Sequence, residues 1–79
     1  MTGIEVPLKD FEAFGKALRR LKPEDRTWLL GLSIELAGNA VKRLAMRRFN
    51  DDDRSASAAR TVFQKLKQHP ALRGLITGA

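Results

Sequence analysis

The sequence contains no cysteine and no tyrosine, and it has a single histidine and a single tryptophan. Without cysteine there is neither a disulfide framework nor a thiolate metal site, and a reducing, intracellular setting fits this composition. His69 is the only histidine available as a general acid or base, and no serine lies in a nucleophile-elbow pattern. We therefore expect a protein that is not an enzyme and that needs no cofactor, no metal and no small-molecule substrate.

Long apolar runs are also absent. Glu35, Asn39 and Lys42 interrupt the most apolar stretch well before the roughly 20 residues that a membrane-spanning helix requires. The first ten residues, MTGIEVPLKD, lack the basic and apolar regions of a signal peptide. These observations predict a cytoplasmic protein without a membrane partner.

The chain is short, with 79 residues. Such chains bury only about 60 to 65% of their unfolded surface, so we expect one domain over residues 1–79 with one modest core. A homodimer through the central helix is an open alternative. Lysine and arginine outnumber aspartate and glutamate by 15 to 9, which gives a formal charge of +6. This excess favours polyanionic partners, although it also keeps a small protein in solution.

The N-terminal third predicts an arm over residues 1–7 and an amphipathic helix over 8–21. The helix follows from apolar residues spaced three and four apart, at Leu8, Phe11, Phe14, Leu18 and Leu21. Gly15 costs such a helix roughly 1 kcal/mol relative to alanine. We expect it to permit close approach by a neighbouring helix.

The central segment predicts a long helix over residues 23–48. Pro23 followed by two acidic residues is typical of a helix start. On a helical wheel Ile34, Val41 and Leu44 share one face, which favours a continuous helix. The alternative is a break at Gly38-Asn39, read as a helix end followed by a new start.

The C-terminal part predicts a helix over 54–68 and a short one over 71–76. The acidic segment 50–53 supplies capping groups for the first of them, in preference to a calcium site, whose spacing it lacks. Its apolar stripe consists of Ala59, Val62, Phe63 and Leu66. We expect Leu72, Leu75 and Ile76 to fold back on the core. The resulting fold class is all-α, a small three- to four-helix bundle with a long central helix.

Two basic groups are the candidate nucleic-acid contacts. One closes the first helix and comprises Lys16, Arg19, Arg20 and Lys22; the other closes the central helix and comprises Lys42, Arg43, Arg47 and Arg48. A continuous central helix sends the two groups to opposite ends of the molecule, whereas a break allows them to converge. The segment fits a helix-turn-helix motif poorly, so we predict contacts to phosphates and not to base edges.

A second hypothesis is a protein-binding adaptor or inhibitor, such as phages encode, that recognises an acidic protein surface. It rests on Trp28 and Leu32, which lie about 160° and 120° from Leu44 on the wheel. A single long helix cannot bury all three on one side. Either the first helix covers Trp28 and Leu32, or they form an exposed anchor for a partner.

The opening GIEV, a spacer and the segment DFEAFGKALRRL before a second helix are similar to the start of small tail-completion proteins of tailed phages. The similarity spans at most residues 3–49. It implies a small phage structural component with a sheet-forming remainder. No such remainder follows in this sequence, and no functional residue is carried over.

Overall fold

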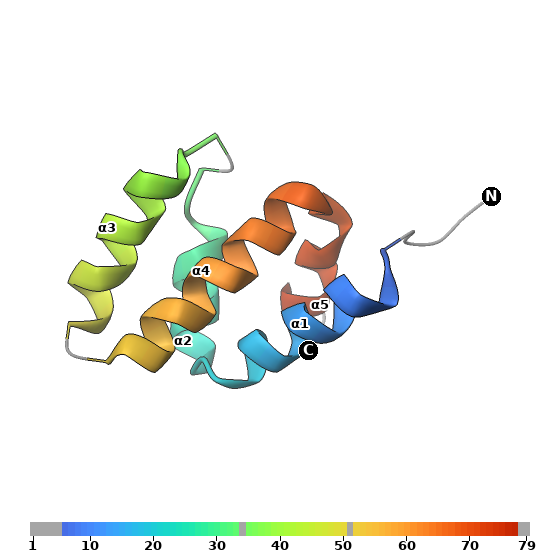
Figure 1. Cartoon of the computed structure of the whole chain (residues 1–79), viewed down its shortest axis with the longest axis horizontal. Helices are drawn as coiled ribbons and strands as arrows, with labels where there is room; N and C mark the ends of the chain where they lie inside the picture. The colour runs from blue at the N-terminus through green and yellow to red at the C-terminus, as the bar shows by residue number, and fades with distance from the viewer. Residues whose placement is uncertain (1–5, 34, 51, 78–79) are drawn as a thin grey trace.

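A computed structural model describes residues 6–33, 35–50 and 52–77. Within these residues the chain is all-α and contains no strand; its elements are α1 (Leu8–Arg19), α2 (Pro23–Leu30), α3 (Gly38–Phe49), α4 (Asp53–Gln68), the 3-10 helix η1 (Pro70–Leu72) and α5 (Arg73–Thr77). Helix α4 crosses the middle of the molecule, with α1 and α3 on opposite sides of it (Figure 1). No helix in the described part is long and apolar enough to cross a membrane.

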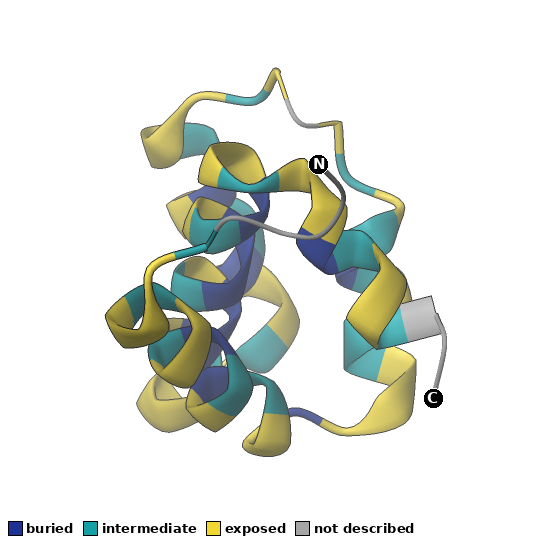
Figure 2. Ribbon diagram, turned by 90° about the vertical axis from the view of Figure 1, so that its right-hand side faces the viewer, coloured by how far each residue is buried: buried dark blue, intermediate teal, exposed yellow. Residues whose placement is uncertain are grey.

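Helix α4 supplies the largest share of the core and confirms the stripe expected of it. Its side chains turned to the other helices are buried, namely Ala56, Ala58, Ala59, Val62, Phe63 and Leu66. The helix begins where predicted, because Asp52 caps it: Asp52 Oδ1 accepts a hydrogen bond from the Ser55 amide at 3.2 Å. Pro70 follows its end, since proline cannot continue a helix. Figure 2 shows the buried positions gathered between the helices.

Helix α1 lies where predicted but presents a different face to the core. Phe14, Ala17 and Leu21 are buried, whereas Leu8 is 71% and Phe11 43% exposed. The expected stripe is therefore wrong at its N-terminal end. The role expected of Gly15 is also wrong, since a Cβ built there would meet only the Arg19 guanidinium, at 3.6 Å, and no neighbouring helix.

The continuous central helix over 23–48 is a wrong prediction, because α2 ends at Leu30 and α3 begins at Gly38. The alternative of a break at Gly38-Asn39 is correct about the new start, since α3 begins at Gly38, but α2 already ends at Leu30. The Gly31 amide donates to the carbonyls of Thr27 (3.2 Å) and Trp28 (3.0 Å), so the last turn tightens and the helix stops. Two short helices can each turn their own apolar face inward, which one straight helix cannot do.

Helix α3 forms an antiparallel hairpin with α4. Asn50, the residue after α3, has a φ of 52°, a positive value that asparagine tolerates better than most residues. Val41 and Ala45 are buried against α4. The basic helix α3 is thereby packed against α4 along much of its length.

The C-terminal residues fold back on the core in part as expected. Leu72 is fully buried and Ile76 packs partly buried against the core, but Leu75 is 41% exposed, which corrects the prediction for that residue. Arg73 Nη2 donates to the Leu30 carbonyl at 3.0 Å. This bond satisfies a backbone acceptor at the end of α2 and ties α5 to that helix.

An ionic contact joins the start of α1 to the end of α4. Lys65 Nζ lies 2.8 Å from Asp10 Oδ1, and His69 Nε2 lies 3.4 Å from Asp10 Oδ2. The hydrogen bond from Lys65, and then that from His69, lowers the pKa of the Asp10 carboxyl below its ordinary value of 3.8. His69 thus has a structural contact at the position where α4 ends.

We expect this contact to make folding stability depend on pH in the acid range. The pKa of Asp10 is lower in the folded chain, so its contribution is present above pH 3.8 and is lost as the pH falls through the lowered value. Asp10→Asn should lower the urea midpoint at neutral pH and flatten the decline below about pH 4. Urea titrations of the unmodified protein and the variant, at several pH values between neutral and acid, give the midpoint as a function of pH. If the two midpoints fall in parallel as the pH is lowered, the Asp10 contact does not cause the pH dependence.

Candidate anion-binding groove

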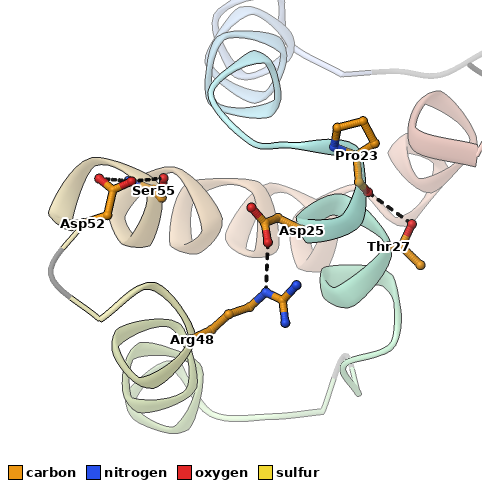
Figure 3. A network of polar contacts seen from close by, with 6 residues as sticks. All are labelled: Pro23, Asp25, Thr27, Arg48, Asp52 and Ser55. Carbon is orange, nitrogen blue, oxygen red and sulfur yellow. Dashed lines mark hydrogen bonds and ion pairs between the residues drawn. The ribbon is translucent and has the colours of Figure 1, made fainter.

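Arg48, one of the predicted phosphate contacts, belongs to a structural network. Its Nε lies 3.0 Å from Asp25 Oδ1, as Figure 3 shows. Its guanidinium carbon lies 4.9 Å from the ring centroid of Trp28, and that ring meets Phe49 edge to face at 5.9 Å. Arg48, at the end of α3, therefore stabilises the packing of that helix against α2.

The first basic group reaches the same end of the molecule. Arg20 lines a hollow with Asp52, Arg54 and Ser55, and Lys22 lines the adjoining one with Asp25, Arg48 and Asp52. The break between α2 and α3 thus brings members of the two groups together. Carboxylates lie among them, so the positive charge here is balanced within the chain.

Ser55 stabilises the ionised form of Asp52. The Asp52 carboxylate accepts hydrogen bonds from the Ser55 hydroxyl at 2.6 Å and from the Ser55 amide at 3.2 Å. These bonds lower the pKa of Asp52. Carboxylates thus lie beside the cations at this end of the molecule and offset part of their attraction for an external anion.

The other predicted cations lie on separate surfaces. Arg19 borders an open hollow on the outward side of α1, together with Lys9, Lys16 and Glu12. Arg43 and Arg47 border a hollow with Ala40 and Leu44 on α3. The six predicted residues therefore do not form one continuous site.

Lys42 is the predicted residue that lies in a clearly formed basic groove. The groove runs between α3 and α4, has a volume of about 340 Å³ and is lined by Gly38, Asn39, Val41, Lys42, Arg60, Phe63, Gln64 and Lys67. Val41 and Phe63 are buried and form its apolar floor. The three cations and the two amide side chains are exposed along its walls.

No carboxylate borders this groove among the residues that the structure describes. Lys42 comes from α3 and Arg60 and Lys67 from α4, so the packing of two helices brings like charges together. Like charges held close repel one another, and an anion between them relieves that repulsion. The hollow beside Arg43 and Arg47 has no carboxylate in its described lining either, but its two cations both come from α3. The groove differs from it because three cations from two packed helices surround one space.

The first turn of α3 adds to the positive field. Its N-cap residue Ala37 provides no side-chain cap, and no acidic residue lies in that turn. The first amides of a helix have no intrahelical acceptor and carry the positive end of its dipole. Gly38 and Asn39 belong to this turn and border the groove.

Arg60, Lys67, Asn39 and Gln64 are site residues that reasoning from the sequence missed. The helical period correctly placed Arg60 and Lys67 outside the apolar stripe of α4. It carried no information about which residues of another helix would face them. That information comes from the antiparallel pairing of α3 and α4, which places the start of one beside the second half of the other.

Trp28 and Leu32, the predicted protein-binding residues, are both partly buried and pack against the core. The cover over Trp28 comes from Arg48 and Phe49 of α3. Part of each side chain stays accessible, and recognition of a protein partner there remains a prediction.

No family model, curated protein or solved structure matches this chain. Its function is therefore argued from the groove and its charges.

Proposed function

We propose that this protein is a non-enzymatic nucleic-acid-associated protein that contacts the phosphate backbone through the groove between α3 and α4. The observation that carries the proposal is the presence of Lys42, Arg60 and Lys67 around one groove without a carboxylate beside them in the described part. Nucleic-acid phosphates are the commonest polyanionic partners of such surfaces, and lysine and arginine are their usual ligands.

Arg43 and Arg47 lie on α3 outside the groove. They are exposed on the same helix as Lys42 and lie away from the core. Their charges add attraction for a strand in the groove at longer range. Arg48, held by Asp25 and Trp28, stabilises the position of α3 and is not a contact in this proposal.

Phosphate-directed binding carries little sequence preference. Base-reading motifs place the exposed face of one helix in the major groove, whereas the cations of this groove come from two helices packed side by side. We therefore expect similar affinities for duplexes of unrelated sequence. We also expect a regulatory or architectural role whose effect depends on how much of the nucleic acid the protein occupies.

The test is the salt dependence of binding to a fluorescein-labelled duplex, followed by anisotropy. Each phosphate neutralised adds about 0.9 to the slope of log affinity against log salt, so three groove contacts predict a slope of roughly 2.7 or more. Duplexes of different sequence should give the same line. Absence of binding at about 50 mM salt, where phosphate contacts are strongest, would refute the proposal.

A further inference from the structure

We propose that the groove between α3 and α4 prefers a terminal phosphate monoester, the phosphorylated end of a nucleic-acid strand, over the diester phosphates within the strand. This inference rests on the proposed function and assigns the ligand group that the groove takes. The cluster that carries it is Lys42, Arg60 and Lys67 around one cavity, with no described carboxylate among them.

Charge is the first reason. A phosphate monoester carries about −1.5 to −2 near pH 7, whereas each diester phosphate carries a single negative charge. Coulomb attraction grows with the charge of the ligand, so three converging cations favour the monoester.

The size of the cavity is the second reason. About 340 Å³ lies at the small end of the range for ligand pockets. Such a cavity accommodates a terminal phosphate and the sugar that carries it, with the apolar floor of Val41 and Phe63 beneath. The rest of the strand leaves the cavity over α3 and its exposed cations.

Lys67 marks one side of the cavity. Its Nζ donates to the Leu36 carbonyl at 3.2 Å, which ties the ammonium group to the segment before α3. An ammonium group has three donors, so others remain for a phosphate oxygen. A cation that is already positioned loses less conformational freedom on binding.

The backbone at the start of α3 is accessible to the same ligand. A Cβ built on Gly38 would meet no atom within 4 Å, so the space beside this residue is open. The amide side chains of Asn39 and Gln64 supply further donors along the walls. These groups add hydrogen bonds to an attraction that the three cations produce.

The experiment compares single strands of about 12 nucleotides, a length within the range of single-strand binding sites. One carries a 5′-phosphate, one a 3′-phosphate and one has hydroxyl groups at both ends, each with an internal fluorophore. One additional charge neutralised on a single strand changes affinity about fivefold at 0.1 M salt. We expect a phosphorylated strand to bind by that factor more tightly, and the two phosphorylated strands show which end enters.

A pH series tests the charge argument. The second proton of a phosphate monoester has a pKa of about 6, so the preference should diminish between about pH 7.5 and 5.5. The titratable groups described around the groove are Lys42, Arg60 and Lys67, and none of them is a carboxylate or a histidine. The hydroxyl-ended strand should bind with nearly constant affinity over the same series.

The variant pair assigns the preference to the groove. Lys42→Gln with Arg60→Gln should abolish it, while Lys9→Gln with Lys16→Gln, an equal change of charge on α1, should preserve it. Equal binding of all three strands by the unmodified protein would overturn this inference and leave the proposed function standing. A preference that survives the groove variant would also overturn it, and no binding of any strand would overturn both proposals.

Discussion

Phe14→Ala should lower the free energy of unfolding by about 3 to 5 kcal/mol, the usual cost of truncating a buried phenylalanine. Phe14 is 1% exposed and fills the core on α1, which packs against α4. Alanine leaves a cavity that two rigid helices cannot close. A chain of this length has about 4 to 12 kcal/mol of stability in total, so the variant should lose at least about a quarter of it.

Phe11→Ala is the matched control. It makes the same chemical change in the same helix, but Phe11 is 43% exposed and contributes less to the core. We expect a loss of about 1 kcal/mol or less. Urea titrations followed by helical circular dichroism and by the fluorescence of Trp28 measure both. Equal losses would show that the apolar stripe expected from the sequence, and not the face described above, is buried.

Replacing Lys42, Arg60 and Lys67 together with glutamine should weaken duplex DNA binding by about 500-fold near 0.1 M salt. Each phosphate contact removed lowers the salt slope by about 0.9, hence roughly 2.7 for all three. Glutamine keeps much of the aliphatic stem and removes the charge. The urea midpoint should stay the same or rise, because the substitutions remove repulsion between exposed like charges.

The control variant carries Lys9→Gln, Lys16→Gln and Arg19→Gln on α1. It loses the same net charge from a helix on the other side of α4 (Figure 1). We expect at most a modest loss of affinity, from the weaker long-range attraction. If this variant loses as much as the groove variant, net charge governs binding and the groove has no special role.

Local chemistry explains the parts of the fold that the sequence predicted well. The bounds of α1 and α4 follow from the helical period, from Asp52 as a cap and from Pro70 as a stop. Each of these signals acts over a few residues of the chain. The short C-terminal helix after Pro70 belongs to the same class of prediction, and the buried Leu72 confirms its packing.

The central segment shows where local signals were insufficient. The apolar positions keep a helical period past residue 31, so the pattern favoured one helix where the structure has two. The choice depends on whether Trp28 and Val41 both reach the core around α4; in the structure Val41 is buried and Trp28 packs partly buried against the core. A break satisfies both faces at the cost of a few helical hydrogen bonds. A helical wheel drawn for a single helix cannot show that two faces of the segment compete for the core.

Spacing, caps and charge are properties of short segments, so they were enough to predict an all-α chain, the positions of its first and fourth helices and a strongly basic composition. They could not predict which cations lie together, because that depends on how the helices pack. Arg48 forms an ion pair with Asp25. Lys42 of α3 lines the same groove as Arg60 and Lys67 of α4. Electrostatic attraction depends on distance in space, and residues 42 and 67 become neighbours only when α3 packs on α4.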